Sequence, residues 1–286
     1  MPSARDLQRQ INTVKNQSRV FSALQTVSSV KFRKAEARVK RARPYADNVE
    51  QMMRDVASSA SGDLPLLVGR EVNRVAVCTL TADRGLAGGF NAQVLRRTVS
   101  LRSEKDQNAL QVASGRKAVA FFRFRRVELA EVFTGFTDSP TYEKAREIGS
   151  TLTGLFEDEE ADEVYLVYNR FESALNQTPV VKRLLPVAEE GDEEQDDGAS
   201  YMEYVPDAET VLKRLVPRYV ETMVWQALLE GAAGEHGARM TAMKNASDNA
   251  NDLVRDLTLQ MNKARQAQIT QEILEIVSGA EALSAG

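Results

Sequence analysis

The chain has few of the residues that most enzymes use for catalysis or metal binding. Its 286 residues include one cysteine, Cys78, and one histidine, His236, far apart in sequence. A single cysteine excludes a disulfide within the chain and fits a reducing compartment. Metal clusters of the usual His and Cys types cannot be built from one residue of each. We therefore expect no metal, no cofactor and a structural role for His236.

Long apolar runs are also missing. No stretch approaches the roughly eighteen consecutive apolar residues of a membrane-spanning helix. The first residues, MPSARDLQRQ, lack the apolar core of a signal peptide. We expect a soluble protein whose membrane contact is only through partners.

Residues 4–60 have the pattern of one very long helix. Alternating steps of four and three residues meet thirteen apolar side chains in sixteen positions, against about seven expected from a 43% apolar composition. These seam positions are Leu7, Ile11, Val14, Ser18, Phe21, Gln25, Ser28, Phe32, Ala35, Val39, Ala42, Ala46, Val49, Met53, Val56 and Ala60. A 3.5-residue repeat of this length predicts a left-handed coiled coil with another helix.

Residues 207–279 have a similar pattern. From Met243 the predicted seam passes through Ala246, Ala250, Leu253, Leu257, Gln260, Ala264, Ala267, Gln271 and Leu274. Asp207 is a candidate N-cap, and Ser278-Gly279 a candidate stop. The two helices would be on the order of 85 and 110 Å long, so part of the pair should project as a rod.

Matching the polar seam positions predicts how the two helices align. The pairing would be antiparallel, with paired residue numbers summing to about 278. This register places Leu7 near Gln271 and Gln25 near Leu253.

Two features predict changes along these helices. Pro44 should bend the first helix or divide it into two segments. In the second, a wider apolar stripe over residues 212–228 ends at GAAGEHG, residues 231–237. We expect the packing partner to change there, with Gly231, Gly234 and Gly237 allowing a close helix crossing.

Between the helical ends, short β-rich runs alternate with amphipathic helices. The expected strands are 72–80, 109–113, 127–134, 164–168 and 180–186, and the expected helices are 92–104, 116–124 and 142–156. This alternation predicts a Rossmann-like α/β domain with a mostly parallel sheet. The expected organisation is an N-terminal coiled-coil helix (1–62), an inserted α/β foot domain (70–205) and a C-terminal coiled-coil helix (207–286).

Charge is unevenly distributed. Residues 1–43 hold eleven Lys/Arg and two acids, a balance of plus 9 in a chain of net charge −4. Seven of the basic residues lie between Lys31 and Arg43. A solvated face, contact with an acidic partner and nucleic-acid binding all remain open. The acidic run 189–197, EEGDEEQDD, is expected to be a surface loop.

The glycine-rich segment TADRGLAGGFN, residues 81–91, follows the first expected strand, where dinucleotide domains bind phosphate. The spacing of Gly85, Gly88 and Gly89 does not match the dinucleotide motif, and no P-loop Lys-Ser/Thr pair follows. We interpret it as a structural turn in which Asn91 caps the next helix. Asp83 and Arg84 would tie this turn to a neighbouring element.

Three segments resemble the gamma subunit of F-type ATP synthase. They are RARPYAD (41–47), TADRGLAGGFN (81–91) and HGARMTAMKNASDNANDLVRDLTLQMNKARQAQITQEILEIVSGAEAL (236–283), and the likeness spans the chain. The resemblance implies a central-stalk rotor shaft without an active site of its own. The shaft would couple proton-driven rotation of the membrane c-ring to conformational changes in the alpha/beta hexamer. Its foot would meet epsilon and the c-ring at the cytoplasmic face of the bacterial cell membrane.

The resemblance also implies partner-binding residues. Those expected to contact the alpha/beta hexamer are Arg9, Lys31, Arg33, Lys34, Arg265, Gln266 and Gln268. One stretch departs from the family: from Val20 the chain reads VFSALQTVSSVKF, so Gln25 stands where a lysine is usual. The alternative function is a non-enzymatic coiled-coil scaffold or a nucleic-acid-binding arm.

Overall fold

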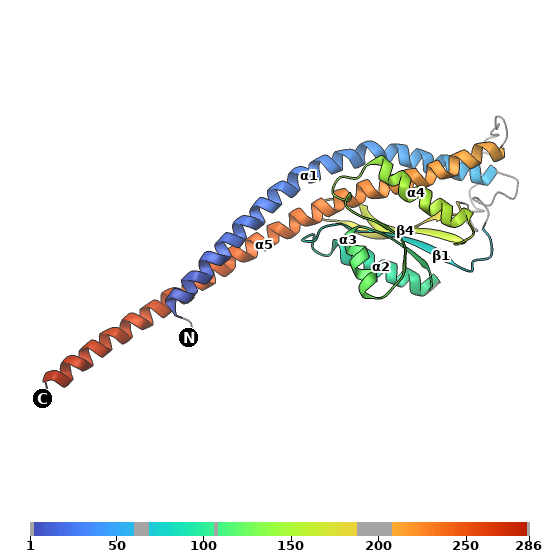
Figure 1. Ribbon diagram of the computed structural model, residues 1–286. Coiled ribbons are helices and arrows are strands. Elements are labelled where there is room, and N and C mark those ends of the chain that lie inside the picture. The colour runs from blue at the N-terminus through green and yellow to red at the C-terminus, as the bar shows by residue number, and fades with distance from the viewer. Residues whose placement is uncertain (1–2, 60–68, 106–107, 188–207, 285–286) are drawn as a thin grey trace. The chain divides into compact units, whose positions relative to one another are not determined.

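The structure, a computed structural model, describes residues 3–59, 69–105, 108–187 and 208–284 (Figure 1). Residues 57–59, 208–210, 212–213 and 281–284 are described by their backbone alone. The chain divides into two compact units, Met1–Val27 with Met240–Gly286, and Ser28–Arg239. Helices α1 (Ala4–Ser59) and α5 (Ala208–Ser284) each run through both units. Ala60, Asp207 and the acidic run 189–197 lie outside the described residues.

Both long helices continue through residues that were expected to interrupt them. Helix α1 is continuous through Pro44, so the predicted division into two segments is wrong. Helix α5 passes Gly279 and ends at Ser284, so the predicted stop is also wrong. A glycine in an exposed helix costs only about 1 kcal/mol, and the alanine and glutamate that follow favour helix. Helix α5 also continues through Pro217.

The unit formed by Ser28–Arg239 contains the five expected strands and three shorter helices. The strands are β1 (Val75–Leu80), β2 (Leu110–Ser114), β3 (Leu129–Phe133), β4 (Glu163–Phe171) and β5 (Gln177–Leu185). The helices are α2 (Phe90–Lys105), α3 (Arg116–Phe124) and α4 (Tyr142–Glu157). In the order β3-β2-β1-β4-β5 all neighbours are parallel except β4 and β5. The predicted mostly parallel α/β sheet is confirmed.

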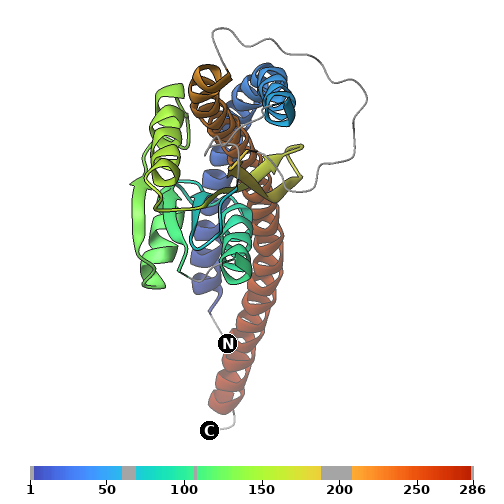
Figure 2. The ribbon, with the colours of Figure 1, turned by 90° about the vertical axis from the view of Figure 1, so that its right-hand side faces the viewer.

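The sheet separates two helical layers, as the alternation along its central strand requires. Ala76 and Cys78 of β1 face a core shared with α4 and with the parts of α1 and α5 in this unit. Val75 and Val77 face α2 on the opposite side. Figure 2 shows the sheet between these layers.

Helices α1 and α5 complete the core of this unit. Met53 of α1 and Val224 of α5 are buried in the same cluster as the sheet residues. On α4, a Cβ placed at Gly149 would lie 3.2 Å from the Cα of Glu221 on α5, so a larger residue would push the two helices slightly apart. Charged groups join the same elements, since Arg43 pairs with Glu230 at 3.0 Å and donates to the Phe171 carbonyl at 2.8 Å. The α/β fold therefore depends on both chain ends.

In the other unit, α1 and α5 form an antiparallel pair. Leu7, Ile11 and Leu257 are buried together, with Val254 and Met261 packed against them. Every described position of the N-terminal seam is buried or half-buried, which confirms that pattern.

The predicted register is wrong, and the predicted C-terminal seam is right only in part. Ser18 is 3.2 Å from the Ser247 hydroxyl and donates to Asn251 at 2.9 Å, so paired numbers sum to 265–269. Beyond Ala250, Leu257 and Ala264 lie in the seam as predicted, but Val254 is half-buried whereas Leu253 is 47% exposed, and Met261 is half-buried whereas Gln260 is exposed. Sliding a 3.5-residue repeat by whole turns preserves most apolar matches, so the pattern alone does not fix the offset.

As a result of this register, no helix among the described residues lies beside the last part of α5. Side chains 265–280 are all exposed. In Figure 1 the C-terminal end of α5 extends past the N-terminal end of α1. Ala267, Gln271 and Leu274, which were expected to lie in the seam, belong to this exposed end.

The register can be tested with cysteine pairs. We expect Ser18→Cys/Ser247→Cys to form a disulfide under mild oxidation, because the two hydroxyls lie 3.2 Å apart. Leu7→Cys/Gln271→Cys should not form a disulfide, because these residues are paired only in the register that was predicted from the sequence. Gel mobility with and without reductant measures both, and rapid cross-linking of the second pair alone would contradict the structure. The native Cys78 is buried and should not interfere.

The three glycines of residues 231–237 have different surroundings. A Cβ at Gly234 would lie 2.9 Å from the Phe90 ring, and one at Gly237 would lie 3.1 Å from the backbone of Ala174. At Gly231 nothing lies within 4 Å. Gly234 and Gly237 therefore do allow a close approach. The elements that approach are α2 and the β4–β5 connection as well as α1.

These surroundings predict that alanine substitutions at Gly231 and Gly234 have opposite effects on stability. Gly231→Ala should raise the free energy of unfolding by roughly 0.5–1 kcal/mol, because alanine favours helix and meets open space. Gly234→Ala should lower it by about 1–3 kcal/mol, because the buried Phe90 ring would have to move. Urea denaturation of the two variants measures the difference, and equal effects would contradict this packing.

Candidate functional site

The glycine-rich turn after β1 is organised around one carboxylate. The Asp83 side chain accepts hydrogen bonds from the backbone N–H groups of Arg116 (3.1 Å), Gly135 (2.9 Å) and Thr137 (3.2 Å), and from the Thr137 hydroxyl (3.1 Å). These donors come from the start of α3 and from the segment after β3. Asp83 therefore ties the turn to two neighbouring elements, as expected.

This arrangement argues against phosphate binding at the turn. Burial alone would raise the pKa of Asp83, but the hydrogen bonds from Gly135, Thr137 and Arg116 outweigh it and lower that pKa. A carboxylate thus already accepts from the first backbone N–H of α3, where a phosphate would otherwise bind. The interpretation of residues 81–91 as a structural turn agrees with these contacts.

The other residues of the turn contribute unequally. Gly88 has φ +53° and Leu86, although not glycine, has φ +62° with 60% of its surface exposed. Gly89 has ordinary space for a Cβ, and Arg84 is exposed. Asn91 does not cap α2 as predicted. It is the second residue of that helix, and its side chain accepts from the Ala82 N–H at 2.8 Å.

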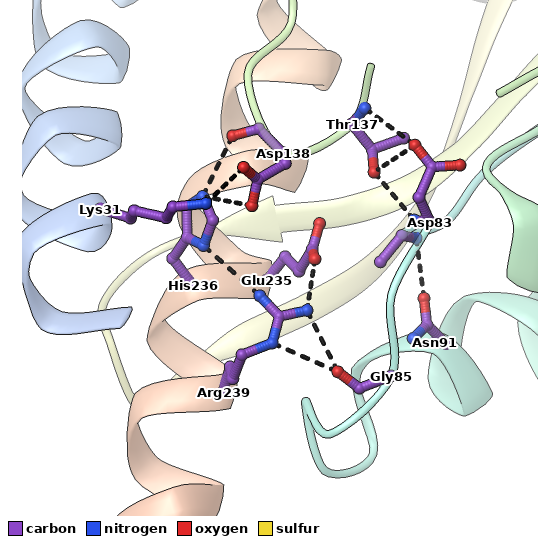
Figure 3. A network of polar contacts seen from close by, with 10 residues as sticks. Lys31, Asp83, Gly85, Asn91, Thr137, Asp138, Glu235, His236 and Arg239 are labelled. Carbon is purple, nitrogen blue, oxygen red and sulfur yellow. Dashed lines mark hydrogen bonds and ion pairs between the residues drawn. The ribbon is translucent and has the colours of Figure 1, made fainter. Parts of the chain in front are cut away.

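A buried ion pair connects α5 to the same turn (Figure 3). The Arg239 guanidinium contacts Glu235 at 2.5 Å and donates twice to the Gly85 carbonyl at 3.2 Å. Glu235 is 1% exposed and Arg239 is 8% exposed. Burial raises the pKa of Glu235, although its partner Arg239 opposes this shift.

The second part of the network joins α1, α5 and the segment before α4. Lys31 pairs with Asp138 at 2.5 Å, and Nε2 of His236 is 3.2 Å from the Asp138 carbonyl oxygen. Burial would raise the pKa of Asp138, but the Lys31 hydrogen bond and the nearby positive charges lower it. Burial lowers the pKa of His236 and so favours its neutral form. His236 is a packed structural residue, as expected.

Four of the seven basic residues between positions 31 and 43 make contacts within the chain. Lys31 pairs with Asp138, and Arg38 donates to the Pro140 carbonyl at 2.8 Å. Arg43 pairs with Glu230, and Lys40 pairs with Glu36 on the same helix. Arg33, Lys34 and Arg41 are exposed. Part of the positive charge therefore holds α1 against its own unit, which weakens the nucleic-acid alternative.

The remaining predicted partner residues lie near the exposed ends of α1 and α5. Arg9 lies 3.8 Å from Asp6 and its side chain is 76% exposed. Arg265, Gln266 and Gln268 are exposed, and Gln268 donates to Glu272 at 2.9 Å. Glu235 and Arg239 were not predicted from the sequence, although their spacing of four residues on a helix is typical of an ion pair.

The described residues contain no cluster of three or more His, Cys, Asp or Glu suited to a metal ion. Cys78 is fully buried in β1, which raises its pKa to about 12 and makes it a poor nucleophile. No helix in the described part of the chain has the length and apolar character needed to cross a membrane.

Known proteins resemble the chain over its full length. The family model described as ATP synthase matches residues 3–283. The ATP synthase gamma chain of Rubrobacter xylanophilus is 68% identical over 290 residues, covering 100% of both chains. The chain belongs to the ATP synthase gamma chain family.

More distant comparisons agree with this assignment. The ATP synthase gamma chain of Desulfitobacterium hafniense is 45% identical and covers 99% of this chain and 100% of that one. A chain of the Euglena gracilis mitochondrial ATP synthase rotor has a TM-score of 0.72 at 19% identity, covering 93% of this chain and 98% of that one. The likeness to the Euglena gracilis chain supports the fold. The resemblance to the gamma family that was seen in the sequence is confirmed.

The buried ion pair on α5 gives a stability prediction. Arg239→Ala should lower the free energy of unfolding by about 3–5 kcal/mol, because it leaves the Glu235 carboxylate buried without its partner. The double variant Glu235→Gln/Arg239→Met should lose less, because no buried charge remains. Urea denaturation monitored by circular dichroism measures both.

Arg255→Ala provides the matched control on the same helix. Arg255 and Asp252 pair at 3.0 Å with side chains that are 79% and 69% exposed, so their loss should change stability by less than about 1 kcal/mol. Equal losses for Arg239→Ala and Arg255→Ala would show that the buried pair does not hold the turn.

Proposed function

We propose that this chain is the central-stalk rotor shaft of an F-type ATP synthase. It would couple proton-driven rotation of the membrane c-ring to conformational changes at the catalytic sites of the alpha/beta hexamer. The observation that carries this proposal is the 68% identity, over both full chains, to a protein named ATP synthase gamma chain. We assign no catalytic site and no cofactor to the chain itself.

The exposed end of α5 supports this role. Among its exposed side chains, Ile269 (47%), Ile273 (55%), Leu274 (60%), Ile276 (71%) and Val277 (53%) are large and apolar. An apolar helix surface of this extent is normally covered by a partner. We infer that the alpha/beta hexamer surrounds this end, with Arg9, Arg265, Gln266 and Gln268 contributing polar contacts.

The exposed basic residues of α1 suit an acidic partner. Arg33 and Lys34 are exposed. We infer that they face acidic loops of the beta subunits. Lys31 was predicted to take part in this contact, but its ammonium group already pairs with Asp138. We therefore give Lys31 a positioning role for α1 rather than a direct contact.

The α/β unit would meet the remaining partners. We infer that it contacts epsilon and the c-ring at the cytoplasmic face of a bacterial membrane, where the chain would be peripheral. A rotor must favour a different state of each catalytic subunit in each orientation, so its contacts must differ between states. An asymmetric unit joined covalently to both long helices provides such differences.

Assembly with the subunits of a close relative tests this function. The chain should co-purify with the alpha and beta subunits of the Rubrobacter xylanophilus enzyme and give a complex with ATPase activity. Ile273→Asn/Ile276→Asn should weaken assembly at least several-fold, because it places polar groups on the surface that the hexamer would cover. The control Arg146→Gln changes an exposed residue of α4 and should assemble normally.

Two results would contradict the proposal. One is failure of the unmodified chain to co-purify with alpha and beta subunits that form a hexamer with each other. The other is normal assembly and ATPase activity of the Ile273→Asn/Ile276→Asn variant, which would remove the α5 end from the interface.

A further inference from the structure

The end of α3 combines positive charge with an exposed aromatic ring. Residues 116–127, RKAVAFFRFRRV, contain five Lys/Arg and no acid. Phe124 is 87% exposed, whereas its neighbour Phe122 is 1% exposed and belongs to the core. The Phe124 ring is therefore not part of the core and is free to contact another surface.

Arg126 occupies a position that normally favours glycine. Its N–H bonds to the Arg123 carbonyl at 3.0 Å, and the Val127 N–H bonds to the Phe122 carbonyl at 3.0 Å. This is the Schellman arrangement, whose left-handed residue is most often glycine. Arg126 adopts it with φ +58°. An arginine therefore occupies a position where glycine would be less strained.

The Arg126 side chain lines a cleft at the end of the sheet where β2 and β3 begin. Arg74 and Arg102 also line this cleft, which has a volume of about 530 Å³. Arg102 is held in place because it donates to the Ala109 carbonyl at 2.6 Å. Glu128 is the acid among the lining residues. Three arginines from different parts of the chain therefore line a space large enough for a phosphate group.

We propose that this surface binds the phosphate headgroups of anionic phospholipids. The surface, named here the arginine face, consists of Phe124 and the arginines Arg74, Arg102, Arg123, Arg125 and Arg126. Guanidinium groups bind phosphate through paired hydrogen bonds, and an exposed ring inserts at the boundary between headgroups and acyl chains. The exposed Phe124 ring favours a lipid headgroup over free phosphate as the ligand, because free phosphate would need only the cleft.

This inference is independent of the proposed rotor function. It gives the chain a direct contact with the membrane surface, whereas the sequence led us to expect contact only through partners. The arginine face lies within the unit Ser28–Arg239, so lipid binding does not require assembly with other subunits. Figure 1 shows α3, which carries Arg123 and Phe124 of this surface, on the sheet's opposite side from α4.

Vesicle sedimentation with the full chain tests the proposal. The chain should bind vesicles of phosphatidylglycerol and phosphatidylcholine, but not vesicles of phosphatidylcholine alone, and binding should weaken as salt increases. Arg123→Gln/Arg126→Gly should reduce the partition coefficient by roughly tenfold or more. Phe124→Ala should reduce binding that persists at high salt, because it removes the apolar contact.

Two comparisons separate binding from folding and from net charge. Arg126→Gly alone should bind vesicles less but resist urea at least as well as the parent chain, because glycine suits φ +58°. Arg19→Gln/Arg146→Gln removes the same charge from exposed positions elsewhere and should leave binding unchanged. Equal losses from this control and from Arg123→Gln/Arg126→Gly would overturn the proposal.

Other probes identify a different ligand if the lipid assignment is wrong. Binding of inorganic pyrophosphate at the strength seen with vesicles would make the cleft a site for free phosphate. Binding of poly-glutamate without binding of vesicles would assign the arginine face to an acidic protein. Either outcome would overturn the lipid proposal.

Discussion

The structure depends on the burial of a shared seam by two helices from opposite ends of the chain. In one unit, Leu7 and Ile11 are buried with Leu257. In the other, Val39 of α1 is buried with Leu229 and Ala233 of α5. The α/β sheet does not close its core without these helices, because Met53 and Val224 belong to the same apolar cluster as β1 and β4. The inserted region therefore shares one apolar core with residues of both long helices.

Polar contacts then position the loops of the sheet around these helices. Asp83 gathers donors from α3 and from the segment after β3. Arg239 holds the adjacent turn through the Gly85 carbonyl, and Lys31 holds Asp138. These charged groups are buried or half-buried with partners, and breaking a buried pair costs more than breaking an exposed one. The network fixes α1 and α5 to the unit that contains the sheet, which a rotor needs in order to transmit torque.

Local patterns in the sequence predicted most of the fold, whereas long-range alignment was harder to predict. The N-terminal seam and all five strands follow from periodicity, and the predicted helix 116–124 coincides with α3. The register between α1 and α5 could not be predicted from periodicity, because a repeating seam fits several registers. The hydrogen bond from Ser18 to Asn251, which fixes the register, joins residues that were not expected to pair. The stop at Gly279 also failed, since one glycine does not outweigh its helix-forming neighbours. Glu235 and Arg239 were missed because their role depends on a turn about 150 residues away in sequence.

Rotation of the assembled chain most directly tests the central claim that the paired helices form a shaft. The alpha/beta hexamer would be fixed to a surface, and a visible probe attached to an exposed residue of the α/β unit. On addition of ATP the account predicts stepwise rotation of the probe in one direction, stopping when ATP is removed. A probe that stays still while the same complexes hydrolyse ATP would contradict the claim.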